Sequence, residues 1–171
     1  MGLRDRFGML CVLARWWGPR DLGLYGLLAA SIGYLLYLIG LEFHAYVTRQ
    51  LIGASPPQQT LLVRDQYSLY LALYALVVPF GLLLFQMELL PWSLAVWFFP
   101  LLLLEHLAQE LNRTLLALDE QNLASLILFC RSGCWCLLVI AVMWRFTAAR
   151  DLAWALWAWA LGAASARGLG L

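Results

Sequence analysis

The stretch Leu101–Leu118, LLLLEHLAQELNRTLLAL, places ionisable side chains between runs of leucine. Its central polar residues are Glu105, His106, Gln109, Glu110 and Arg113. At 3.6 residues per turn, Glu105, Gln109 and Arg113 stack one turn apart on a helix, with His106 and Glu110 adjoining them. Ions exposed to lipid are costly, so such a stripe must face a protein interior or a water-filled cavity. The stretch therefore predicts a helix inside a larger membrane bundle.

The composition of the whole chain supports a membrane protein. Hydrophobic residues make up 64% of the 171 residues, charged residues 12%, and the mean hydropathy is +0.79. Soluble domains carry about 25% charged residues. Nine tryptophans and seven tyrosines are typical of a chain with two membrane interfaces. The net charge of +1 provides no basic field for nucleic acid.

Apolar segments predict an all-α, polytopic bundle of about six transmembrane helices, in a single domain over residues 1–171. A membrane-spanning helix needs about 20 mostly apolar residues. The expected helices are 7–17, which is short, 22–46, 67–85, 92–118, 123–144 and 152–164. A cytoplasmic loop is expected at 47–66, where Pro56 and Pro57 exclude a continuous helix.

The arginine distribution predicts a cytoplasmic N-terminus. With that orientation, five arginines lie inside and three lie outside, which is the direction of the positive-inside rule. The first residues also resemble a signal peptide, but Trp16, Trp17 and Pro19 stand where a small-residue cleavage site is needed. We therefore expect a short first membrane helix there.

Two interpretations of the polar stripe remain open. In the structural one, Glu105 and Glu110 pair with Arg113 and Arg131 to hold helices together, or the stripe lies near a helix end and reaches water. In the functional one, the stripe lines a hydrophilic pathway or binding cavity, as ionisable residues within membranes commonly do.

Other charged residues occur within the expected helices. Glu42, Tyr46 and Arg49 share one helix face, a pattern typical of a salt bridge at the membrane interface. Arg131 follows an apolar run and precedes a Ser-Gly step that allows close helix approach, so it needs either a buried carboxylate or a substrate anion. Arg15 lies in the short first helix and can reach water.

Metal chemistry and catalysis are not expected. A zinc-binding helix of the H-E-x-x-H type needs two histidines four residues apart, and the segment EHLAQE contains one. Three of the four cysteines fall within one apolar segment, which favours buried thiols over a disulfide framework or a metal site. We therefore predict no enzyme activity, no cofactor and no metal.

Three sequence blocks resemble a known family. The first is LARWWGPRDLGLYGLLAASIGYLLYLIGLEFHAYVTRQLI, which contains the pattern A-R-x-x-G-P-x-x-x-G-x-Y. The pattern falls on Ala14, Arg15, Gly18, Pro19, Gly23 and Tyr25. LLEHLAQELNRTLLAL and LASLILFCRSGCW follow in order. Together the blocks are similar to polysaccharide-biosynthesis flippases, the Wzx-like oligosaccharide exporters of the multidrug/oligosaccharidyl-lipid/polysaccharide superfamily.

The resemblance implies export of a lipid-linked or anionic oligosaccharide across the bacterial inner membrane by alternating access. Family members have about twelve or more helices in two lobes, so the six expected here resemble the amino-terminal lobe. The chain is then a truncated or half-transporter that needs a second lobe or a second copy. The residues expected to bind the glycan are Arg15, Arg49, Arg113 and Arg131. The residues expected to couple transport to an ion are Glu42, Glu105, His106, Gln109 and Glu110. A non-transporting scaffold or subunit of a polysaccharide assembly complex is the alternative.

Overall fold

The computed structural model describes residues 14–40, 43–51, 53–129, 133, 135–147 and 150–168, which form helices and turns and no strand. The elements in chain order are α2 (Pro19–Gly40), α3 (Phe43–Leu51), α4 (Pro56–Gln86), the 3-10 helix η1 (Trp92–Leu94), α5 (Ala95–Ala117), α6 (Gln121–Phe129), α7 (Trp135–Arg145) and α8 (Leu152–Gly168). The predicted all-α class is confirmed for this part of the chain.

Three helices are long and apolar enough to cross a membrane: Pro19–Gly40, Pro56–Gln86 and Trp92–Ala117. Two more apolar helices are shorter, Trp135–Arg145 and Leu152–Ser165. Large apolar side chains such as Leu71, Leu76 and Val96 are more than 70% exposed, which suits a surface surrounded by lipid. These features indicate a membrane-embedded chain.

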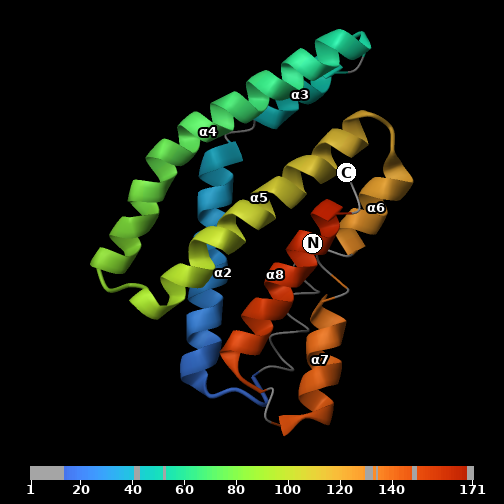
Figure 1. Ribbon diagram of the computed structural model, residues 1–171. Coiled ribbons are helices and arrows are strands. Elements are labelled where there is room, and N and C mark those ends of the chain that lie inside the picture. Colours follow the sequence, from blue (N-terminus) through green and yellow to red (C-terminus); the bar gives the residue numbers. More distant parts are fainter. Residues whose placement is uncertain are drawn as a thin grey trace.

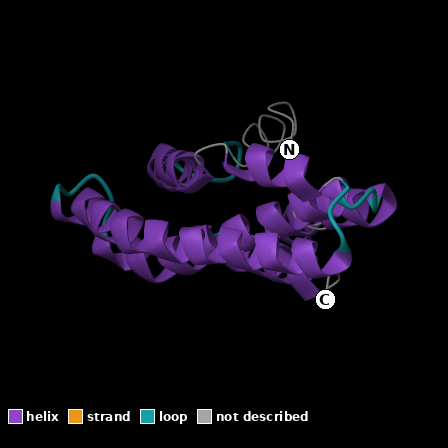
Figure 2. Ribbon diagram, turned by 90° about the horizontal axis from the view of Figure 1, so that it is seen from above, coloured by secondary structure: helices purple, strands orange, loops and turns teal. Residues whose placement is uncertain are grey.

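The helices form one bundle around α2 and α5. In Figure 1, α2 passes behind α5, α4 and α3 lie beyond one side of α5, and α8 and α7 lie on the other. From above, the bundle is shallow and elongated (Figure 2). α2 contributes one continuous stripe to the core, with buried residues at helical spacing: Tyr25, Leu28, Ile32, Leu35 and Ile39.

The prediction of a loop at 47–66 is wrong over most of its length. α3 continues to Leu51, and α4 begins at Pro56, so the connection is 52–55 and the helix expected at 67–85 starts eleven residues earlier. Proline has no backbone N–H, and the N–H groups of the first helical turn have no partner within the helix. Pro56 and Pro57 are therefore well suited to begin α4, and they also separate it from α3. The Ser55 backbone N–H donates to Gln58 Oε1 at 3.1 Å and closes the helix start.

Other expected bounds also differ. The segment 22–46 covers most of α2 and the first residues of α3, with residues 41–42 outside the described part. Residues 14–17 form a turn, whereas helix was expected over 7–17, and residues 7–13 lie outside the described part. Within 123–144 the structure has α6 and α7, and the helix expected at 152–164 continues to Gly168. The stretch 92–118 is η1 followed by α5, close to expectation.

Candidate functional site in the α4–α5 interface

A polar cluster lies between α4 and α5. From α4 come Gln66, Tyr70 and Tyr74, spaced four residues apart, and from α5 come His106, Glu110 and Arg113. The spacing places each set along one face of its helix. Both helices belong to the set long and apolar enough to cross a membrane. We call these six residues the α4–α5 polar cluster.

Glu110 is the centre of the cluster. It is 1% exposed, yet its carboxylate accepts three hydrogen bonds. Oε2 accepts from Gln66 Nε2 at 2.7 Å and from the Tyr70 hydroxyl at 2.8 Å, and Oε1 accepts from Arg113 Nη1 at 2.5 Å. A buried carboxylate is tolerated only with such donors. The side chains that meet Glu110 therefore tie α4 to α5.

Arg113 is the accessible end of the cluster. Its side chain is 28% exposed, against 2% for the side chain of Glu110. A guanidinium carries five N–H donors, and the bond to Glu110 uses only the Nη1 group. Arg113 therefore keeps donors for a second anion while it neutralises Glu110.

His106 occupies an aromatic pocket next to Glu110. Its Nδ1 lies 3.0 Å from the Tyr74 hydroxyl, and its ring meets the edge of Tyr70 at a centroid distance of 4.6 Å. Nε2 is buried and has no hydrogen-bond partner. An unsatisfied buried nitrogen costs free energy, so this ring position has spare hydrogen-bonding capacity for a proton or a water molecule.

The predicted stripe divides into two faces. Glu105 points away from the α4–α5 polar cluster, and its Oε1 accepts a hydrogen bond from Trp159 Nε1 of α8 at 2.5 Å. Residues five apart on a helix are about 140° apart, so Glu105 and Glu110 cannot share one partner helix. Gln109 is half-buried and has no hydrogen bond to the described residues. Glu105, Gln109 and Arg113 do lie one turn apart on α5, and Arg113 pairs with Glu110 at i,i+3, as the structural interpretation expected.

The remaining predicted residues lie elsewhere. Arg15 is exposed in the turn before α2. Arg49 is exposed on α3, where it lines a polar hollow of about 560 Å³ with Gln50 and Gln58. Glu42 and Arg131 are outside the described residues. Within the described part of the chain, no three His, Cys, Asp or Glu side chains are grouped to hold a metal ion.

Four contributors were missed in the sequence: Gln66, Tyr70, Tyr74 and Trp159. Gln66 falls in the loop expected at 47–66, and the two tyrosines and the tryptophan fall within expected helices, where no role is predicted for them. A signal was present in QYSLYLALY, where a glutamine and two tyrosines recur every four residues in an apolar helix. Trp159 gave no comparable signal.

The Glu105–Trp159 bond yields a testable prediction. Trp159→Phe removes the N–H donor and keeps an aromatic ring, so we expect a loss of about 1–2 kcal/mol in unfolding free energy, the usual cost of a buried polar group that loses a donor. Thermal unfolding in detergent measures it. Trp154→Phe is the control, since Trp154 is 56% exposed on the same helix. Equal losses for the two variants would contradict the assigned role.

Comparison with known proteins identifies no family for this chain. No protein-family model matches the chain, no curated protein matches it, and no solved structure matches it. The function must therefore be inferred from the chain's own residues.

Proposed function

We propose that the chain is a membrane transport lobe that exports a lipid-linked or anionic oligosaccharide across the bacterial inner membrane for surface polysaccharide synthesis. The observation that carries the proposal is the α4–α5 polar cluster, in which a buried carboxylate and a buried histidine lie beside a partly exposed arginine, between two helices long enough to span a membrane. Ionisable groups in such positions commonly form substrate or ion pathways. The sequence blocks that resemble flippases support the same function.

Arg113 is the proposed contact for the anionic part of the glycan. Phosphates and carboxylates bind guanidinium groups through paired hydrogen bonds, and Arg113 has both exposure and spare donors. An anion bound there competes with Glu110 for the same positive charge. Because Glu110 also holds Gln66 and Tyr70, that competition would loosen α4 from α5, which couples substrate binding to helix movement. Arg15, Arg49 and Arg131 are proposed as further contacts along the route.

The acidic and imidazole groups are proposed to couple this movement to an ion gradient. Tyr70 contacts both groups: its hydroxyl donates to Glu110 and its ring packs against His106. A change of charge on one group is therefore expected to alter the hydrogen bonds of the other. Glu105 holds α8 in the same way, through Trp159. Glu42 and Gln109 complete the proposed set. Alternating access also needs a second bundle that moves against this one, supplied by another lobe or by a second copy.

A second candidate function is a non-transporting scaffold of a polysaccharide assembly complex. The observation that favours it is that Glu110 finds all three of its donors within this chain, as a helix-joining group would. Co-purification separates the two functions. A partner with a complementary helix lobe supports transport, whereas glycosyltransferases as the sole partners support a scaffold.

Export by an Arg113→Gln variant tests the transport function. In a strain that needs this chain for surface polysaccharide, we expect export to fall about tenfold or more, as expected when a charge-assisted hydrogen bond is lost. Arg113→Lys should recover part of it, because the charge remains without the planar fork. Arg64→Gln is the control, since Arg64 is exposed and pairs only with Asp65. Full export by Arg113→Gln, at equal protein abundance, would reject the substrate role.

A further inference from the structure

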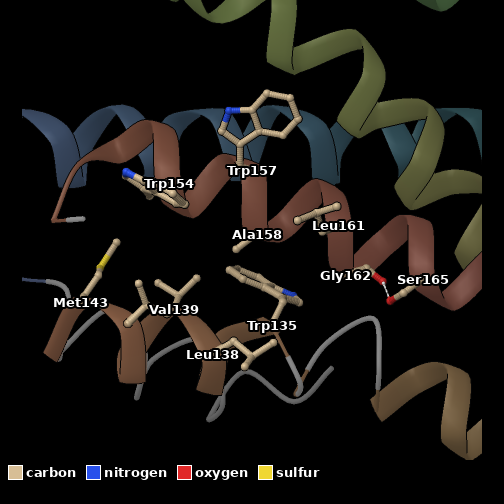
Figure 3. Close-up of a pocket in the computed structure, with 11 residues that line it drawn as sticks. Trp135, Leu138, Val139, Met143, Trp154, Trp157, Ala158, Leu161, Gly162 and Ser165 are labelled. Atoms are coloured by element: carbon tan, nitrogen blue, oxygen red, sulfur yellow. Dashed lines mark hydrogen bonds between the residues drawn. The ribbon is translucent and has the colours of Figure 1, made fainter. Parts of the chain in front are cut away.

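A long apolar groove runs between α7 and α8. Its volume is about 500 Å³, and Figure 3 shows its residues spread from Met143 and Trp154 at one end to Gly162 and Ser165 at the other. Leu138 and Val142 of α7 form one wall, and Trp157 and Leu161 of α8 form the other. Its lining is almost entirely hydrocarbon and aromatic, which suits an apolar occupant.

A second hollow of about 500 Å³ adjoins the first on a neighbouring face of α8. It is lined by Asp151, Ala153, Trp154, Trp157 and Leu161, the last three of which also line the first groove. These three side chains are therefore the shared wall, or ridge, between the two hollows. We call it the α8 ridge.

The α8 ridge lies beside a helix that is long enough to cross the membrane. Trp157 contacts Trp97 of α5 edge-to-face at a centroid distance of 4.8 Å, and Trp159 is bonded to Glu105 of α5. α8 thus packs along α5. Trp154, Trp157 and Leu161 are each more than half exposed, so both hollows lie at the apolar surface, where leaving them empty would forfeit dispersion contacts.

Charged groups gather at one end of both hollows. Arg150 Nε donates to the backbone oxygen of Met143 at 3.0 Å, and its guanidinium lies over the Trp16 ring, so the group is held next to a residue that lines the first groove. Arg145 is exposed two residues after Met143, at the end of α7. Asp151 is exposed at the mouth of the second hollow. The same end therefore offers two positive charges and one negative charge.

We propose that the α8 ridge binds one membrane phospholipid with an amino headgroup, such as phosphatidylethanolamine. One acyl chain occupies each hollow, the phosphate contacts Arg145 and Arg150, and the ammonium faces Asp151. Guanidinium groups bind phosphate through charge-assisted hydrogen bonds, and Asp151 disfavours a headgroup with no positive charge. The site is separate from the α4–α5 polar cluster, so it does not depend on the proposed transport function.

Native mass spectrometry of the full chain tests the proposal. The chain is released from nanodiscs that contain equal amounts of phosphatidylethanolamine and phosphatidylglycerol, and the bound mass is read directly. We expect one phosphatidylethanolamine per chain. Phosphatidylglycerol in its place, a polyprenyl phosphate carried from the cells, or no bound lipid would each overturn the proposal. Because export is not measured, failure here leaves the proposed transport function unaffected.

Two variants locate the lipid. Ala158→Phe fills the first groove and should reduce retention about tenfold, whereas Ala141→Phe, on an exposed α7 position that lines neither hollow, should retain lipid like the unaltered chain. Arg145→Gln should reduce retention about fivefold, the effect of one arginine near a membrane surface, with Arg64→Gln as its control. If Ala158→Phe fails to fold, the Arg145→Gln variant tests the proposal by itself. Unchanged lipid retention by the Arg145→Gln chain would overturn the headgroup assignment.

Discussion

Glu110→Ala is expected to destabilise the folded chain by about 3–5 kcal/mol, the combined cost of leaving two buried donors without an acceptor and losing one charge-assisted hydrogen bond. The substitution leaves the amide of Gln66, the hydroxyl of Tyr70 and the guanidinium of Arg113 without their shared acceptor. Arg113 can turn towards water, because its side chain is partly exposed, but Gln66 and Tyr70 are buried and cannot. The loss should therefore appear mainly as separation of α4 from α5.

The control for this substitution lies one position away. Gln109→Ala changes a half-buried polar side chain that makes no hydrogen bond to the described residues, so its effect should stay within about 0.5 kcal/mol. Glu110→Gln keeps the shape, one acceptor and no charge, and should fall between the two. Denaturation in detergent, followed by the near-ultraviolet signal of the tyrosines, measures all three. A Glu110→Ala chain as stable as the Gln109→Ala chain would show that the cluster does not hold α4 in place.

Gly162→Leu is expected to cost about 3 kcal/mol, at the upper end of typical overpacking effects. A Cβ atom at Gly162 would lie 2.6 Å from Trp135 Cδ1 and 3.0 Å from Trp135 Cβ, so the indole cannot escape by moving only its far end. Trp135 would have to leave its position parallel to Trp159, where the ring centroids are 6.1 Å apart and the planes differ by 10°. Trp159 is the donor to Glu105, so the disturbance would reach α5.

Gly33→Leu is the matched control. A Cβ at Gly33 has no heavy atom within 4 Å, and the position is exposed on α2, so the added side chain meets only surrounding lipid. Replacing glycine within a helix also favours the folded state by about 0.5–1 kcal/mol, and Gly33→Leu should therefore be neutral or stabilising. Tryptophan fluorescence during thermal unfolding measures both variants. Equal stability of the two would mean that the α7–α8 contact at Trp135 is not tightly packed.

The helical class and the polar character of α5 could be predicted because both depend on local composition. An apolar run of about 20 residues in lipid must be helical, since no solvent satisfies its backbone groups. Burial of Glu105, His106 and Glu110 follows from the same reasoning, and all three are at most 3% exposed. Their partners could not be predicted, because Gln66 and Trp159 are 44 and 54 residues away from the glutamates they contact.

The arginines also show that the sequence alone does not reveal which residues a side chain contacts. Arg113 and Arg49 were expected to have the same role, binding an anionic glycan, and each follows a glutamate in the sequence. In the structure Arg113 neutralises a buried carboxylate, whereas Arg49 is exposed beside the short connection from α3 to α4. The surroundings of Arg113 depend on α4, which begins at Pro56 and is 31 residues long. Gln66 therefore lies within this helix and donates to Glu110, the partner of Arg113.

What the sequence determined by itself is the solvent: hydrocarbon around the apolar segments, with helices as the stable structure and the two glutamates and the histidine of α5 turned inward. Only the tertiary structure decided that α5 serves two neighbours, with Glu110 bonded to α4 and Glu105 bonded to α8. Helical periodicity gives the direction of each side chain about its own axis. Which helix lies in that direction depends on how connections and packing arrange the bundle, and no local pattern encodes it.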